Sequence, residues 1–123
     1  MNQSIDKTRK TTADKLKLVY IAGPFRGPAP SDVDRNIERA EAAARFAVTR
    51  GVFPVTPHSI GARLQDVGSQ ESFWLPGTLE LMRRCDEVWV VPKFEQSKGT
   101  RNEIDEARRL GLRVVYLTEE DLL

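Results

Sequence analysis

The sequence predicts a three-layer α/β domain, because short apolar runs alternate with helical patterns along most of its 123 residues. Three of the four apolar runs lead directly into a loop that contains Pro. Strands separated by helices form βαβ units with right-handed crossovers, which build a parallel sheet with helices on its faces. We therefore expect one domain over residues 16–123, with a small parallel sheet of four to five strands.

The first strand and the first helix follow a polar N-terminal segment. Residues 1–15 are expected to form a mobile polar tail. Residues 18–22 are apolar and favour a β-strand that ends at a Gly-Pro pair. A long helix then begins at Ser31 or Asp32, either of which can cap it, and ends before Gly51. The apolar face of this helix holds Val33, Ile37, Ala40, Ala44 and Ala47.

The middle of the chain gives weaker signals. Residues 52–55 predict a second strand, which Pro54 places at an edge of the sheet. Residues 56–76 are expected to hold one or two short helical turns. Apolar residues with helical spacing then predict a further helix that ends near Asp86.

The last third of the chain repeats the strand–helix–strand pattern. Residues 88–91 are apolar throughout and predict a central strand. A helix over about residues 100–110 ends at Gly111, and residues 113–117 form the last strand. Together these elements predict a flavodoxin-like or Rossmann-like arrangement.

Composition excludes several classes of function. The chain has 19 basic and 18 acidic residues, so it has no overall positive potential that would attract a nucleic-acid polymer or a membrane surface. A single cysteine, Cys85, excludes an internal disulfide and a cysteine metal cluster, and its apolar setting favours a buried structural thiol. The single histidine excludes a His-based metal site. With no apolar run that could span a membrane, we expect a cytoplasmic protein.

Ligands of open parallel sheets bind at the carboxyl ends of the strands. The loops at that edge are residues 23–30, 56–59 and 92–99. Arg26 supplies a planar donor fork for phosphate or carboxylate, and Gly23 and Gly27 let a ligand approach the backbone. The order Gly-Pro-Phe-Arg-Gly differs from the dinucleotide-binding and P-loop patterns, so no nucleotide cofactor is expected.

The segment from Ser97 to Glu103 is the strongest candidate for a ligand site. It is a small, polar, Gly-containing loop that opens a helix, where a phosphate can bind. Glu103 is predicted in the first helical turn, where the helix dipole favours its ionised form. The order Thr100-Arg101-Asn102-Glu103 also matches a capping box, which explains Glu103 without any chemistry.

Two further residues have alternative interpretations. Tyr20, inside the first strand, is either a core residue or a partner of Glu103. His58 is either a helix cap or surface residue, or part of a ligand site.

Several motifs in their order and spacing resemble the nucleoside 2-deoxyribosyltransferase superfamily, and most closely its DUF4406-type branch. These motifs are residues 19–27, Pro57-His58, Cys85-Asp86 and Ser97-x-Gly99-Thr100-x-x-Glu103-x-x-x-Ala107. The resemblance covers residues 17–117. It implies a flavodoxin-like fold, a homodimer or higher homo-oligomer, and cleavage of the N-glycosidic bond of a 2′-deoxynucleoside or its 5′-monophosphate by hydrolysis or deoxyribosyl transfer.

The resemblance also implies roles for individual residues. Glu103 is the implied nucleophile that attacks C1′, and Tyr20 orients it. The implied substrate-binding residues are Gly23, Pro24, Arg26, Gly27, His58, Thr78, Ser97, Gly99 and Thr100. Thr78 stands where the superfamily has an aspartate, and a threonine cannot deliver a proton to the leaving base at neutral pH.

The function predicted from the sequence is therefore N-glycosidic bond cleavage or deoxyribosyl transfer through a carboxylate nucleophile. The alternative, which Thr78 favours, is a non-catalytic nucleotide-binding or regulatory module on the same fold. The expected partner is a small-molecule nucleoside or nucleotide, with no metal and no cofactor.

Overall fold

The computed structural model of the protein describes residues 15–64 and 71–123. A four-stranded parallel sheet forms its centre, with the strand order β2-β1-β3-β4. The strands are β1 (Leu18–Ala22), β2 (Phe53–Val55), β3 (Glu87–Val90) and β4 (Arg113–Tyr116). The predicted tail at residues 1–15 lies, except for its last residue, outside the described residues.

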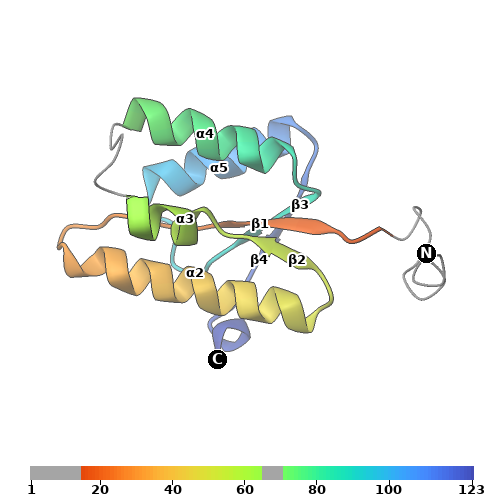
Figure 1. Cartoon of the computed structure of the whole chain (residues 1–123), viewed down its shortest axis with the longest axis horizontal. Coiled ribbons are helices and arrows are strands. Elements are labelled where there is room, and N and C mark those ends of the chain that lie inside the picture. The colour runs from red at the N-terminus through yellow and green to blue at the C-terminus, as the bar shows by residue number, and fades with distance from the viewer. Residues whose placement is uncertain (1–14, 65–70) are drawn as a thin grey trace.

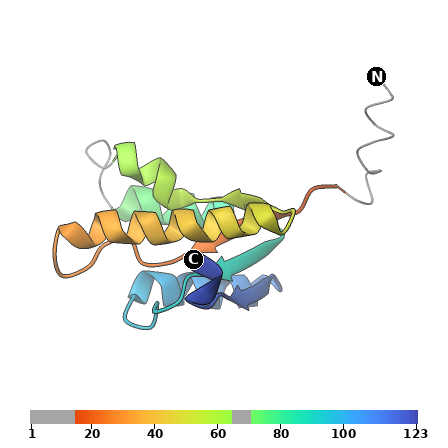
Figure 2. The same cartoon turned by 90° about the horizontal axis from the view of Figure 1, so that it is seen from below.

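Helices cover both faces of the sheet, so the predicted three-layer, flavodoxin-like α/β fold is confirmed (Figure 1). One face carries α2 (Ser31–Thr49), with α3 (Pro57–Leu64) packed beside it. The opposite face carries α4 (Glu71–Arg83) and α5 (Lys98–Arg109). A short 3-10 helix, η2 (Glu120–Leu122), brings the C-terminus back against α2 (Figure 2).

The alternation of side chains along β1 divides the core into two halves. Val19 and Ile21 face α2, whose Ala40, Ala43 and Ala47 are fully buried and let the helix approach the sheet closely. Tyr20 and Ala22 face the other side, where Met82, Ile104 and Ala107 of α4 and α5 complete the second half. This register directs Tyr20 towards α5.

The structure confirms the positions of the strands and corrects the start of the long helix. Pro54 lies in an edge strand and β3 is central, as predicted. Neither Ser31 nor Asp32 caps α2, because the Asp32 carboxylate accepts a hydrogen bond from the Ala29 N–H that precedes the helix, at 2.9 Å. On the apolar face, Ala43 is buried where Ala44 was expected to be.

The segment predicted to hold short helical turns is more regular than expected. Residues 57–64 form α3, and α4 begins at residue 71 and continues through Pro76. The part of the prediction that concerns residues 65–70 lies outside the described residues. Both helices border the carboxyl edge of the sheet, where the candidate site lies.

Candidate functional site

A hollow of about 600 Å³ lies at the carboxyl edge of the sheet. Its walls are formed by the loop that follows β1, by the helices α3 and α4, and by the first turns of α5. Nine of the eleven predicted site residues line it: Tyr20, Gly23, Arg26, His58, Thr78, Ser97, Gly99, Thr100 and Glu103. Pro24 and Gly27 do not line it. The parallel topology thus gathers residues from loops that are far apart in the sequence.

Other lining residues add apolar and amide surface. Gly61, Leu75 and Gln96, which no sequence signal singles out, also line the hollow, together with Phe25 and Asn102 from two of the predicted segments. Trp74 of α4 also lies in the wall. Aromatic rings of this kind stack on flat ligands such as nucleobases.

Tyr20 and Glu103 form the polar centre of the hollow. The Tyr20 hydroxyl donates a hydrogen bond of 2.6 Å to Oε2 of Glu103. Tyr20 is fully buried, so it is both a core residue and the partner of Glu103. Burial raises the pKa of Glu103 to about 7, although the bond from Tyr20 acts in the opposite direction. Near neutral pH the carboxyl group therefore interconverts between its charged and neutral forms, as groups that act in catalysis do.

Tyr20 itself remains protonated. Burial raises its pKa well above the usual value, and the neighbouring charge of Glu103 raises it further. The tyrosine is therefore a permanent donor to the carboxylate.

Helix α5 is capped by Ser97 and not through Thr100. The Thr100 N–H donates to Ser97 Oγ at 3.1 Å, and the Thr100 hydroxyl donates to the same oxygen at 2.9 Å. The helix begins at Lys98, so Glu103 lies in its second turn. The predicted capping box and the predicted dipole stabilisation of Glu103 are both wrong, because its side chain turns to Tyr20 and burial raises its pKa.

The start of α5 offers donors to an anion. In a helix that begins at Lys98, the backbone N–H groups of Lys98 and Gly99 have no carbonyl partner inside the helix. The Ser97 oxygen accepts two bonds in the cap, which leaves its own proton for a ligand. A Cβ atom added at Gly99 would meet no atom within 4 Å, so open space borders the backbone here. These features suit a phosphate oxygen.

The glycines of the loop after β1 serve the packing of the fold. A Cβ atom on Gly23 would lie 3.0 Å from the Val91 side chain, and one on Gly27 would lie 2.6 Å from Oδ2 of Asp32. The sequence interpretation, that both glycines admit a ligand, is therefore incomplete. Gly23 borders the hollow, whereas Gly27 is needed for the turn into α2.

His58 fixes that same loop. It is 5% exposed, and its Nε2 lies 3.1 Å from the Gly23 carbonyl oxygen and 2.8 Å from that of Pro24. Because both neighbours are acceptors, Nε2 carries the proton. Burial lowers the pKa of His58, so the ring is neutral at pH 7. The interpretation of His58 as a surface residue or helix cap is wrong, because its ring is buried and clamps the loop against α3.

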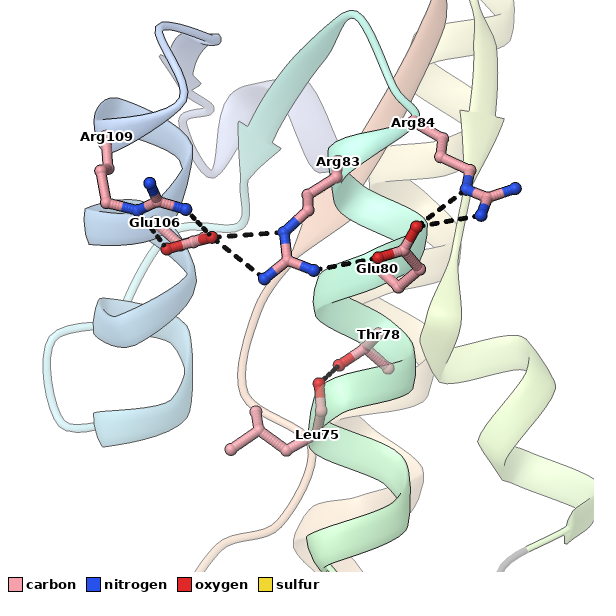
Figure 3. Close-up of polar contacts among 7 residues, drawn as sticks. All are labelled: Leu75, Thr78, Glu80, Arg83, Arg84, Glu106 and Arg109. Carbon is pink, nitrogen blue, oxygen red and sulfur yellow. Dashed lines mark hydrogen bonds and ion pairs between the residues drawn. The ribbon is translucent and has the colours of Figure 1, made fainter.

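Thr78 lies on α4 beside the Tyr20 hydroxyl, where it partly opposes the rise in the pKa of Tyr20 that burial and Glu103 cause. Its own hydroxyl donates to the Leu75 carbonyl oxygen at 3.1 Å (Figure 3). Among the described residues that line the hollow, Glu103 is the only carboxylate. The described site therefore contains one carboxyl group and no second carboxyl group beside it.

A network of ion pairs joins α4 to α5 on the outer surface (Figure 3). Arg83 bridges Glu80 at 3.0 Å and Glu106 at 3.3 Å. Arg84 pairs with Glu80, and Arg109 pairs with Glu106 at 2.7 Å. The hydrogen bond from Arg109 lowers the pKa of Glu106 to about 2. The network holds together the two helices that carry Thr78 and Glu103.

The positive charges at the mouth of the hollow differ from those in this network. Arg26 and Lys98 line the hollow, and Arg101 lies one helical turn from Lys98. Within residues 15–64 and 71–123, none of these three side chains forms an ion pair. The Arg26 guanidinium instead lies 5.6 Å from the centroid of the Phe25 ring. Cations without acidic partners are free to bind an anionic ligand.

Cys85 and Asp86 lie away from the hollow and have structural roles. Burial, with a smaller effect from Asp86, raises the pKa of the Cys85 thiol to about 11, so the thiol is unreactive. The Asp86 carboxylate accepts a hydrogen bond of 2.8 Å from the Leu18 N–H at the start of β1. The burial of Cys85 agrees with its predicted role as a structural thiol.

The part of the chain that the structure describes contains no cluster of three or more His, Cys, Asp or Glu side chains placed to hold a metal ion. In the same part of the chain, no helix is long and apolar enough to cross a membrane.

Comparison with known proteins places the chain in a family other than the one its motifs resemble. Residues 17–117 match the domain of unknown function DUF7768, and no curated protein matches the chain. The assignment to the DUF4406-type branch of the nucleoside 2-deoxyribosyltransferase superfamily is therefore wrong. Several of the shared motif residues serve needs of the fold: Gly23 packs under Val91, Ser97 caps α5 and Ala107 is buried in the core. The chain belongs to the DUF7768 family.

Proposed function

We propose that the protein cleaves the N-glycosidic bond of a nucleoside or its 5′-monophosphate, with Glu103 as the nucleophile. The observation that carries the proposal is the 2.6 Å hydrogen bond from Tyr20 to Oε2 of Glu103 inside the hollow. Because Tyr20 occupies Oε2, it fixes the carboxylate and leaves Oε1 to react. A carboxylate that is oriented and partly desolvated is the usual nucleophile in retaining glycoside cleavage.

The proposed reaction has two steps. Oε1 of Glu103 attacks C1′ while the bond from C1′ to the base nitrogen breaks, and the electron pair of that bond leaves with the base. The base then takes a proton from water, because the described lining contains no second carboxyl group. In the second step water attacks C1′ of the glycosyl ester, releases Glu103 and gives the free sugar; another base in place of water gives transfer.

The remaining lining fits the two ends of such a substrate. The Phe25 and Trp74 rings offer faces for the base. Arg26, Lys98 and the N–H groups at the start of α5 offer donors for a 5′-phosphate. The distribution of apolar and cationic groups thus follows the distribution of charge in a nucleotide.

The test is release of free base from ribo- and deoxyribonucleosides and their 5′-monophosphates, followed by chromatography. We expect release by the native protein and a loss of about 10³-fold or more in Glu103→Gln, which keeps the side-chain shape but removes the nucleophile. Glu106→Gln is the matched control, because Glu106 lies one turn further along α5 and faces the Arg109 network. Absence of base release from every compound, with the protein folded, would overturn the proposal.

A second candidate is a nucleotide-binding module without turnover, and Thr78 favours it. Loss of general acid catalysis typically costs about 10²–10⁴-fold in rate, and Thr78 cannot act as that acid. This candidate predicts that a nucleoside monophosphate raises the melting temperature, that Arg26→Ala reduces the rise, and that no base is released. The two candidates thus share the ligand site and differ in the fate of the ligand.

A further inference from the structure

A second hollow of about 400 Å³ adjoins the first. Lys98 and Asn102 line both hollows, so the two meet at the first turns of α5. The far wall of the second hollow comes from the loop after β3 and from the end of β4. The proposed reaction at Glu103 uses none of this wall.

That wall is an aromatic platform. Phe94 and Tyr116 stack with their ring centroids 5.6 Å apart and their planes inclined by 28°. Arg108 donates a hydrogen bond to the Tyr116 hydroxyl, which holds the ring in place. Tyr116 is nevertheless 45% exposed, so it presents open aromatic surface at the carboxyl end of β4. Exposed rings held in this way stack on planar ring systems.

The charges around the platform lack acidic partners. Lys98, Arg101 and Arg108 line the second hollow, and none of them forms an ion pair within the described residues. Arg109, the next residue along α5, does not line the second hollow and pairs with Glu106 (Figure 3). One helix therefore keeps a neutralised outer side and an unpaired cationic side that faces the hollow.

The geometry points to a dinucleotide as the ligand: two nucleosides joined by a diphosphate, one in each hollow. One nucleoside lies over Glu103, the diphosphate crosses the junction at Lys98 and the N–H groups of α5, and the second base stacks on the platform of Phe94 and Tyr116. Asp105, which lines the second hollow, supplies an acceptor for ribose hydroxyls. The placement of one glycosidic bond at Glu103 rests on the proposed function. The second subsite rests only on the geometry of the second hollow.

A small ligand fits better than a nucleic-acid polymer. The whole chain has a formal net charge of +1, so its composition provides no overall positive potential for a phosphate backbone. Four cations without ion pairs among the described residues, Arg26, Lys98, Arg101 and Arg108, line the two hollows.

The test is calorimetric binding to the Glu103→Gln variant, which removes turnover from the measurement. We expect diadenosine diphosphate to bind at least tenfold more tightly than adenosine 5′-monophosphate. Tyr116→Ala should weaken the dinucleotide roughly tenfold and leave the monophosphate unchanged, since one stacked base accounts for about that change. Tyr116→Trp should restore the affinity, and Arg109→Ala, on the paired side of α5, should have no effect.

Three outcomes would overturn the inference. They are equal affinity for the two ligands, a loss in Tyr116→Ala that is the same for both, and tighter binding of a thymidine hexanucleotide than of diadenosine diphosphate. None of these outcomes depends on base release. If the protein releases base from monophosphates and also shows one of them, the proposed function stands and only the second subsite is overturned.

Discussion

Glu87 and Glu103 are both shielded carboxyl groups, and they behave in opposite ways. Glu87, at the amino end of β3, is 6% exposed and meets Lys17 at 2.8 Å, Arg113 at 3.6 Å and the Trp89 indole N–H at 3.0 Å. Burial acts to raise its pKa, but these partners together hold the pKa below its ordinary value. Glu103, at the carboxyl end, has one neutral partner and a pKa of about 7.

The contrast shows what distinguishes a structural carboxylate from a reactive one in this fold. Burial is common to both, so burial alone does not identify a site. The cations at the amino end turn towards Glu87, whereas those at the carboxyl end leave Glu103 unpaired. A carboxyl group that the fold leaves without a cation costs stability, and such costs are typical of functional sites.

The largest expected effect is on stability, in Glu103→Gln. Folding raises the pKa from 4.5 to about 7, so the native state binds more protons than the unfolded state between these values and stability falls as the pH rises through them. The amide of the variant does not ionise, so burying it does not destabilise the folded state at high pH. We therefore expect the variant to be more stable than the native protein by about 3 kcal/mol at pH 8 and by less than about 1 kcal/mol at pH 5. Urea denaturation at the two pH values measures the difference. A gain that does not depend on pH would show that the carboxylate is not the source of the cost.

Glu87→Gln should have the opposite sign. Its pKa is lowered by folding, so its stabilising effect is present above pH 4.5 and is lost as the pH falls through the lower native pKa. We expect a loss of about 2 kcal/mol at pH 7, since bonds to a charged acceptor are replaced by bonds to a neutral one while Lys17 and Arg113 remain hydrated. The same urea series measures it, with the loss shrinking towards pH 3. Equal effects for the two variants would remove the distinction between the two ends of the sheet.

Much of the fold follows from the sequence because its signals are local. The apolar run of β3 and the proline of β2 predict a central and an edge strand, and both predictions are confirmed. Residues 57–64 were harder to predict, since a helix of eight residues with Gly61 in its interior gains its stability from packing on α2 and not from its own propensity.

The site was less predictable, because its contacts are not local. The pair of Tyr20 and Glu103 spans 83 positions and depends on which side of β1 faces α5. Glu103 matched a capping box in the sequence, yet Ser97, three residues before Thr100, competes for the same N–H and is the cap. The platform of Phe94 and Tyr116 joins the loop after β3 to the end of β4, which only the strand order brings together.

Tyr20→Phe sharpens the comparison by removing the one hydrogen-bond partner that the Glu103 side chain has among the described residues. The hydroxyl lowers the pKa of Glu103, so its loss should raise that pKa further above 7, by about one pH unit. For the native protein, kcat/KM for base release should rise about tenfold per pH unit up to about pH 7 and then level, because the ionised form attacks. In the variant the rise should continue to about pH 8. Carbon-13 NMR titration of the carboxyl group measures the same pKa without turnover, and an unchanged midpoint would contradict the assigned hydrogen bond.

The smallest expected effect separates ligand binding from folding at the carboxyl end. Gly99 and Gly77 both lie in helices, and an added Cβ meets no atom within 4 Å at either position. Alanine should therefore leave stability unchanged or raise it by up to about 1 kcal/mol in both variants. Only Gly99 borders the hollow, so only Gly99→Ala should weaken binding of adenosine 5′-monophosphate, by roughly tenfold or 1.4 kcal/mol. Thermal melts with and without the nucleotide measure both effects, and equal nucleotide-dependent shifts in the two variants would place the phosphate away from the start of α5.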